Sequence, residues 1–359
     1  MSIEHHGPKN MFSLPTPDHR GVVTALKQHP QNMPDGVQAL IFVPDYSVDG
    51  EKDPRIIPVF DSRDPSQHDL IAACYADPKK MGVAFGVGLF GAVFRVPSPR
   101  DERFPEAKNA LSRFKPDRSP HDKLPIFLHP KNLGGLIDRT QVHPDFQRFV
   151  ENREALEKLY EQAGAIHIIV PIKPDHPHVD PVFIHTKETW EAKNAHPDQH
   201  LDVPTVSAFY WDDPDNQSIA FATERKTPNG YMAISSFNKH TEPPAWDMKA
   251  LLEFIQENNF CPFDYVVADS WNDSHSVRSS FAQIQVPLVG QDPVWRVYRG
   301  GPTDIGEYLK RIGSDHDWRM VEQAKEKAAR DFPNDVDLEP ALWNVMQNTA
   351  ARYRERRVK

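Results

Sequence analysis

The sequence contains very little cysteine: only Cys74 and Cys261 occur among its 359 residues. Two cysteines cannot form the disulfide framework of a small secreted domain, so a reducing compartment is the simpler assumption. No apolar run approaches the ~18 residues that a membrane-spanning helix requires. The start of the chain, MSIEHHGPKN, also lacks the charged and then apolar stretch of a secretion leader. These absences predict a cytoplasmic protein that does not span a membrane.

The charge balance of the chain is acidic. Its 51 acidic and 42 basic side chains give a formal net charge of -9 at pH 7. This excess disfavours broad nonspecific binding to nucleic acid, although it leaves room for a local basic patch. The hydrophobic content of 39% and the charged content of 26% are those of a soluble globular protein. The length allows two domains, or one domain with long extensions.

A predicted buried strand in the second half of the chain ends in a polar turn. Residues 231–236 have the β-branched and apolar content of a buried strand, and residues 238–244 are polar. The strand therefore brings Ser236 and Asn238 to its end. Open α/β sheets place their ligand chemistry at such strand ends.

Four motifs in this half follow one another in the order of a known family. Ser236-Phe237-Asn238 followed by Glu242-Pro243-Pro244 resembles the Ser-x-Asn signature and following turn of the YrdC-like family. That family includes threonylcarbamoyl-AMP synthase and other carbamoyl-adenylate-forming domains. Asp264-Tyr265-Val266-Val267, the pair Ser279-Ser280 and Arg299-Gly300 are similar to its next three motifs. The order and spacing together identify a divergent relative of this family.

Three cations precede a predicted strand in the first half. Lys115, Arg118 and Lys123 stand ahead of the apolar residues 124–128 and resemble the Lys-x-Arg phosphate tract of the family. Two residues rather than one separate Lys115 from Arg118. Fixed cations at this place would stabilise the charge that develops on the α-phosphate and on pyrophosphate. A solvated charged loop is the alternative, because Lys and Arg are mostly surface residues.

Three positions depart from the family pattern. Phe90 and Gly91 replace a Tyr-Gly pair, and the threonines that precede this pair in the family are absent. His167 stands in place of a threonine, and Phe209 in place of an arginine. These positions are expected to contact the substrate, so the departures predict an acceptor other than L-threonine. For His167 the alternative is a hydrogen-bonded core histidine, although an ordinary histidine pKa allows proton transfer near neutrality.

Two further patterns have weaker functional interpretations. Gly86-x-Gly88-x-x-Gly91 matches a dinucleotide-binding turn, but the residues after it indicate a strand, so no helix N-terminus would face a pyrophosphate. Close packing of two strands also explains these glycines. The histidines of residues 173–203 could be drawn as metal ligands, but no cysteine accompanies them. We therefore predict an insertion loop there, and no metal site.

The resemblance implies an α/β fold of the α+β type. It covers residues 36–312 and implies a single twisted sheet of mixed strand direction around a concave site, with helices on the outer face. Residues 1–35 are predicted to form an irregular arm. Residues 313–359 are predicted to form a C-terminal helical extension. For its basic end, a solvated helix terminus is favoured over an RNA contact.

The function that the resemblance implies is ATP-dependent activation of a carbamate or carboxylate as an acyl (carbamoyl) adenylate, with release of pyrophosphate. ATP and Mg²⁺ would be its cofactors. The acceptor would be a small molecule, an amino acid or amine, used together with bicarbonate. The predicted catalytic residues are Lys115, Arg118, Ser236 and Asn238. The predicted cofactor-binding residues are Lys123, Ser279, Ser280 and Arg299. The predicted substrate contacts are Phe90, His167 and Phe209.

Three alternatives stay open at this stage. The first is a genuine threonylcarbamoyl-AMP synthase that acts in tRNA modification. The second is a noncatalytic YrdC-like module that binds RNA or protein, for which nucleic acid is a candidate partner but not the favoured one. The third is a nicotinamide-dependent oxidoreductase, which depends on the glycine motif alone.

Overall fold

The structure is a computed structural model. It describes residues 10–13, 24–27, 39–43, 47–48, 51–52, 55–61, 64–77, 79–84, 93–116, 118–119, 121–163, 165–173, 176, 179–192, 202–211, 231–237, 248–258, 261–268, 282–299, 309 and 316–317. Predictions that fall on other residues lie outside this description.

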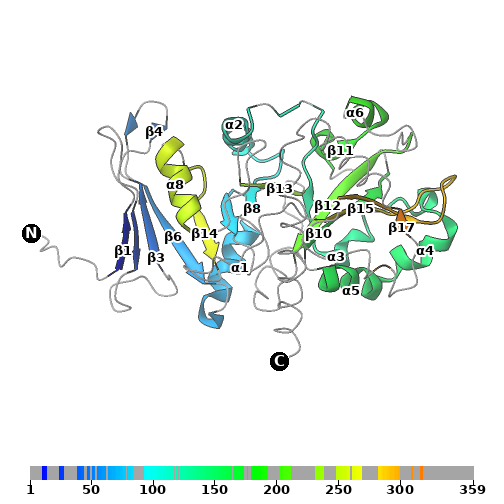
Figure 1. The fold of residues 1–359 in the computed structure, drawn as a ribbon, viewed down its shortest axis with the longest axis horizontal. Helices are drawn as coiled ribbons and strands as arrows, with labels where there is room; N and C mark the ends of the chain where they lie inside the picture. Colours follow the sequence, from blue (N-terminus) through cyan, green and yellow to red (C-terminus); the bar gives the residue numbers. More distant parts are fainter. Residues whose placement is uncertain are drawn as a thin grey trace, which may run out of the picture.

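Fifteen described strands form one sheet that runs through the molecule (Figure 1). One half contains, in spatial order, β1 (Asn10–Ser13), β2 (Thr24–Lys27), β3 (Ala39–Val43), β6 (Arg55–Asp61), β14 (Tyr265–Ala268), β7 (Gly82–Ala84) and β8 (Val93–Val96). The path continues through β13 (Met232–Ser236), β9 (Ile126–Phe127), β12 (Thr205–Trp211), β10 (Ala165–Pro171), β15 (Ala282–Gln285), β16 (Trp295–Arg299) and β17 (His316–Asp317). Strand β11 (Ile184–His185) pairs with β12, and β4 (Ser47–Val48) forms a separate hairpin with β5 (Glu51–Lys52).

The sheet is mixed in strand direction, as predicted. Strand β14 runs parallel to both β6 and β7, and β10 runs parallel to β15. In contrast, β13 is antiparallel to both β8 and β9, and β10 is antiparallel to β12. The predicted α/β class with one large mixed sheet is therefore confirmed. The curl of this sheet around a concave site stays a prediction.

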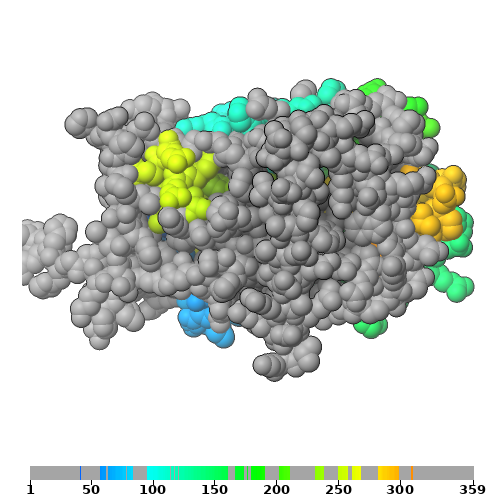
Figure 2. Space-filling model, viewed as in Figure 1, coloured from blue at the N-terminus to red at the C-terminus, as the bar shows by residue number. Residues whose placement is uncertain are grey.

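Helices cover the sheet. The described helices are α1 (His68–Ala76), α2 (Phe104–Phe114), α3 (Pro130–Leu133), α4 (Pro144–Glu151), α5 (Arg153–Ala163), α6 (Lys187–Ala192) and α8 (Met248–Asn258), with short 3-10 turns η2 (Pro65–Gln67), η3 (Arg139–Gln141) and η4 (Pro181–Phe183). Helices α3, α4 and α5 gather beside the second half of the sheet, whereas α8 lies near β6 and β14 (Figure 1). Helix α8 forms part of the outer surface in Figure 2, where it is yellow-green. Within the described ranges, no helix has the length and apolar character that crossing a bilayer requires.

Aromatic side chains fasten α4 and α5 to the second half of the sheet. The fully buried Trp295 of β16 receives the edges of Phe146 and Phe149 from α4, with ring centroids 5.5 and 5.4 Å away. Tyr160 of α5 donates a hydrogen bond of 3.2 Å to the carbonyl of Ala208 in β12. Edge-to-face pairs of this kind add roughly 0.5–1.5 kcal/mol to the effect of burial itself.

The two ends of the chain differ from the prediction. Residues 10–13 and 24–27 are not irregular: β1 pairs with β2, and β2 extends the sheet beyond β3. The physical reason is that β3 would otherwise present an edge of unpaired backbone groups. At the other end, residues 316–317 form β17, which pairs with β16, so the predicted helical pattern does not hold there. The helices predicted for the rest of the C-terminal extension lie outside the described residues.

Two internal segments also differ from the prediction. The apolar periodicity of residues 144–163 predicts a single helix, but these residues form two helices, because Asn152 between them is extended and ends α4. Its Oδ1 accepts a hydrogen bond of 3.2 Å from the amide of Ala155, which begins α5. The predicted insertion loop at 173–203 contains η4, β11 and α6. Phe183 is buried in the main core, and the ring of Trp190 stacks on Tyr298 of β16 with centroids 5.7 Å apart, so this segment packs onto the sheet.

Candidate functional site

A lysine from the first half of the chain meets two serines from the second half. The ammonium Nζ of Lys115 donates a hydrogen bond of 3.0 Å to Oγ of Ser235 and one of 2.9 Å to Oγ of Ser236. The partners are 120 and 121 residues apart in sequence. The structure thus brings together Lys115 and Ser236, two residues that the sequence predicts to act in one site.

Helix α2 delivers Lys115. One face of this helix is buried through Ala107, Ala110 and Leu111. Lys115 is its C-terminal capping residue, with φ -135 and ψ 67, and its amide donates to the carbonyl of Leu111 at 2.8 Å. The backbone therefore leaves the helix at Lys115, and its side chain extends to the end of β13.

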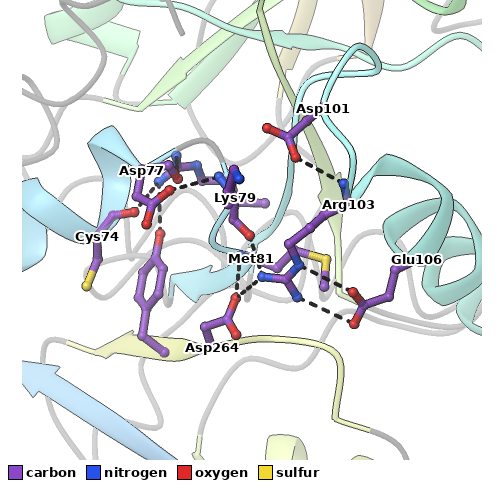
Figure 3. Close-up of polar contacts among 10 residues, drawn as sticks. Cys74, Asp77, Lys79, Met81, Asp101, Arg103, Glu106 and Asp264 are labelled. Carbon is purple, nitrogen blue, oxygen red and sulfur yellow. Dashed lines mark hydrogen bonds and ion pairs between the residues drawn. The ribbon is translucent and has the colours of Figure 1, made fainter. Parts of the chain in front are cut away.

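The other end of α2 is held by a polar cluster at the start of β14 (Figure 3). Asp264 Oδ2 accepts a hydrogen bond of 2.7 Å from Nη1 of Arg103 and one of 2.9 Å from the amide of Met81. Burial alone would lower the pKa of Arg103, but its hydrogen bonds to Asp264 and Glu106 raise that pKa above its ordinary value. The cluster ties the start of α2 to β7 and β14, which fixes the helix that carries Lys115.

The end of β13 extends beyond its described pairing with β9. Ser235 and Ser236 pair with Phe94 and Val93 of β8. On the opposite side β13 pairs with β9, whose described register covers only Met232 and Ala233. The amide of Ile234 also donates to the carbonyl of Pro125. Ser235 and Ser236 lie beyond this described pairing, and the ammonium of Lys115 contacts both of their hydroxyls.

The other two predicted cations make different contacts. Arg118 is half-buried, and its Nη2 donates to the carbonyl of Asp122 at 3.1 Å. Burial lowers the pKa of Arg118, while the Asp122 carboxylate acts in the opposite direction. Lys123 Nζ donates to the carbonyl of Pro181 in η4 at 3.2 Å. These hydrogen bonds do not join Arg118 or Lys123 to Ser236, so their predicted contact with phosphates stays a prediction.

The predicted substrate residues His167 and Phe209 are neighbours across β10 and β12. Phe209 is completely buried, and the ring centroid of His167 lies 4.6 Å from that of Phe209. Nδ1 of His167 lies 3.2 Å from Oγ of Ser207, within hydrogen-bond distance. His167 is therefore the buried, hydrogen-bonded histidine of the sequence alternative, and its contact with a substrate stays a prediction.

Several predicted site residues lie outside the description. They are Phe90, Asn238, Ser279 and Ser280. The backbone of Arg299 belongs to β16 and pairs with Gln283, but its side chain is outside the description. Sequence reasoning missed Ser235. The available signal was a pair of adjacent hydroxyl residues at the end of a strand.

The glycine motif lacks the context of a dinucleotide site. The described residues after it form β8, which returns antiparallel to β7. A pyrophosphate-binding turn requires a helix at this place, whose N-terminus would face the phosphates. The oxidoreductase alternative is therefore contradicted by the order of these elements.

Comparisons with known proteins give matches only among solved structures. No protein-family model matches the chain, and no curated protein sequence does. Sua5 from P. abyssi complexed with L-threonine matches at 15% identity and a TM-score of 0.46, covering 72% of this chain and 62% of that one. YciO from E. coli matches at 14% identity and a TM-score of 0.43, covering 68% and 96%. HypF from T. kodakarensis matches at 13% identity and a TM-score of 0.35, covering 61% and 22%.

Sua5 and YciO are YrdC-like proteins. Both matches are at low sequence identity, 15% and 14%. The chain covers less than two thirds of P. abyssi Sua5, 64% and 62% in two structures.

Proposed function

We propose that this protein is an ATP-dependent enzyme that activates a carbamate or carboxylate as an acyl adenylate and releases pyrophosphate. The observation that carries the proposal is the contact of Lys115 with Ser236, 2.9 Å from Nζ to Oγ. This contact joins the lysine of the tract that resembles the family's phosphate-binding motif to the serine of the Ser-x-Asn motif. The two motifs lie in opposite halves of the sequence.

The proposed reaction concentrates negative charge. An oxygen of the carbamate or carboxylate attacks the α-phosphorus, and the bond from that phosphorus to the bridging oxygen breaks. Pyrophosphate leaves with the bonding electron pair. Lys115 would stabilise the charge on the α-phosphate oxygens and on the leaving group, since a fixed cation needs little reorganisation during the reaction. Ser236 would orient the acyl or adenylate group.

Magnesium would be held chiefly by the nucleotide. Mg²⁺ retains several waters and typically binds one or two carboxylates together with substrate phosphates. Across the described ranges, no cluster of three or more His, Cys, Asp or Glu side chains offers a ready-made metal site. The proposed role of the ion is to neutralise phosphate charge. Further contacts to the nucleotide and the acyl group are proposed for Asn238, Ser279, Ser280 and Arg299.

The acceptor is proposed to be a small molecule other than L-threonine. The support for this is the replacement of a threonine by His167 and of an arginine by Phe209. These side chains pack against each other on one face of the sheet. A buried phenylalanine cannot donate the hydrogen bonds that an arginine would give to a carboxylate or phosphate.

A cytoplasmic location stays a prediction from the sequence.

The direct test is exchange of labelled pyrophosphate into ATP. Purified protein is assayed with Mg²⁺, bicarbonate and each member of a panel of amino acids and amines. We expect exchange that depends on both bicarbonate and one acceptor. Strict dependence on L-threonine would instead assign the protein as a threonylcarbamoyl-AMP synthase. Absence of exchange together with salt-sensitive RNA binding would support the noncatalytic module.

Two lysine variants test the site itself. Lys115→Met removes the charge but keeps much of the side-chain volume, and we expect the exchange rate to fall by about 100-fold or more. Lys108→Met is the matched control, because Lys108 is exposed on the same helix. If both variants keep the wild-type exchange rate, the assignment of Lys115 is contradicted.

A further inference from the structure

We infer that Ser235 is a positioning residue for Lys115. The effect of Ser235 on catalysis rests on the proposed function, whereas its contact with Lys115 is independent of that function. Ser235 Oγ accepts a hydrogen bond of 3.0 Å from Lys115 Nζ, almost as short as the 2.9 Å bond to Ser236. Ser235 directly precedes the Ser-x-Asn motif and is not among the predicted site residues. Its contact with Lys115 assigns it a role beside Ser236.

Two adjacent serines on one ammonium are unusual in a strand. Successive side chains of a β-strand point to opposite faces of the sheet, so one group seldom contacts both. Here the two serines are the last residues of β13, beyond the register of β9. At this strand end the ammonium of Lys115 contacts both hydroxyls.

The chemistry of this arrangement suits a lysine that binds phosphate. A lysine ammonium is a point charge with three donors on a flexible stem, which loses considerable rotamer entropy when it is fixed. Two hydroxyl acceptors fix its position before a nucleotide arrives. Both acceptors are neutral, so neither hydrogen bond cancels the positive charge. Ser235 therefore orients the cation without reducing its attraction for a phosphate.

Ser235→Thr and Ser235→Val form the matched pair for the test. Both substitutions add a methyl-sized group and β-branching to a strand position, so any steric cost is common to both. Only threonine keeps the hydroxyl. We expect Ser235→Val to lower kcat for pyrophosphate exchange about tenfold, and Ser235→Thr to stay within about twofold of wild type. The KM for the amino acid or amine should change by less than about twofold in either variant, because Ser235 acts through Lys115.

A second readout does not depend on activity. Reductive methylation of the protein without nucleotide, followed by mass spectrometry, measures the reactivity of individual lysine amines. Lys115 should be modified several-fold faster in Ser235→Val than in Ser235→Thr, because one hydrogen bond that restrains its Nζ is lost. The exposed Lys108 serves as the internal reference and should be modified equally in both.

The two readouts separate the two claims. A faster modification of Lys115 in the valine variant, with no exchange activity in any protein, would support the positioning role and reject the proposed function. Equal modification of Lys115 in the valine and threonine variants would overturn the positioning role, whatever the exchange activity is.

Discussion

Thr205 and Thr189 are two buried threonines with opposite hydrogen-bond surroundings. Thr205 is fully buried in β12, and among the described residues its Oγ1 has no hydrogen-bond partner. Thr189 Oγ1 donates to the carbonyl of Thr186 and accepts from its amide, both at 2.8 Å. A buried hydroxyl without a partner destabilises the fold, whereas one with two partners stabilises it.

The same substitution should therefore have opposite effects at these two positions. Thr205→Val keeps the shape and removes the unsatisfied hydroxyl, so the free energy of unfolding should rise by about 0.5–1 kcal/mol. Thr189→Val should lower it by about 1–2 kcal/mol, because the amide of Thr186 loses its partner and the carbonyl of Thr186 keeps only the amide of Trp190. Urea unfolding monitored by circular dichroism measures both. Destabilisation of similar size in both variants would contradict this account.

At the residue scale, the sequence predicts which residues belong to one site better than it predicts the hydrogen bonds that those residues make. The order of the motifs predicts that Lys115 and Ser236 belong to one site, and the structure brings them into hydrogen-bond contact. The adjacent hydroxyls of Ser235 and Ser236 were the only signal for Ser235, and a strand pattern argues against a shared contact because it assigns adjacent residues to opposite faces. The carbonyl partners of Arg118 and Lys123 were also beyond prediction, since they depend on how the loop backbone folds.

Two helices begin with a histidine followed by a proline. His129 accepts a hydrogen bond at Nδ1 from the amide of Lys131 at the start of α3, at 3.1 Å. His143 makes the equivalent bond at the start of α4, to the amide of Asp145 at 3.2 Å. Such a cap requires a neutral imidazole, because a protonated ring has no acceptor nitrogen.

His129 should make stability depend on pH. Burial, assisted by the charge of Lys131, lowers the pKa of His129 from 6.5 to about 4; Arg153 acts in the same direction and Glu157 against it. Below pH 6.5 the unfolded chain binds a proton that the folded protein does not. Stability should therefore fall as the pH decreases from about 6.5 toward 4, by about 1 kcal/mol at pH 5 for this half-buried ring.

The variant His129→Asn isolates this contribution. Asparagine is a good N-cap and does not titrate, so the slope of stability against pH between 4 and 6.5 should become shallower than in the wild-type protein. Denaturant unfolding at several pH values provides the comparison of slopes. Identical slopes for the two proteins would show that His129 titrates normally in the folded state.

The anchor of α2 should depend on Asp264 far more than on its exposed neighbours. The Arg103 and Asp264 side chains are 23% and 24% exposed, and Asp264 also holds the amide of Met81. The nearby pair of Lys79 and Glu102 is 57% and 70% exposed. We expect Asp264→Ala to lower the free energy of unfolding by about 2 kcal/mol, and Glu102→Ala by less than about 0.5 kcal/mol. Equal costs in urea unfolding would contradict the assignment of the anchor.

At the element scale, helix boundaries were harder to predict than strands. The strands over residues 39–43 and 205–211 agree with their β-branched and apolar content. Residues 144–163 show one continuous apolar periodicity, yet Asn152 divides them by ending α4 and capping α5. Periodicity reports the buried face of a helix, and it does not report a single residue that leaves the helical conformation.

At the scale of the whole molecule, sequence reasoning predicts the mixed α/β sheet but not its extent. The motifs cover residues 36–312, whereas β1 and β2 lengthen the sheet from a region expected to be irregular. Strands of four residues rich in polar groups carry little periodic signal. Pairing with the edge of β3 determines their conformation, and such long-range pairing is not encoded locally.

The central claim is that a nucleotide binds where α2 and β13 meet, against Lys115 and Ser236. An acyl phosphate of ATP tests this directly: a lysine Nζ near the phosphates attacks the acyl carbon, an amide forms, and ATP leaves. Mass spectrometry then identifies the acylated lysines. We predict that Lys115 is acylated, that excess ATP suppresses this modification, and that Lys108 shows no such protection. Modification of Lys115 that ATP does not reduce, or none at all, would contradict the account.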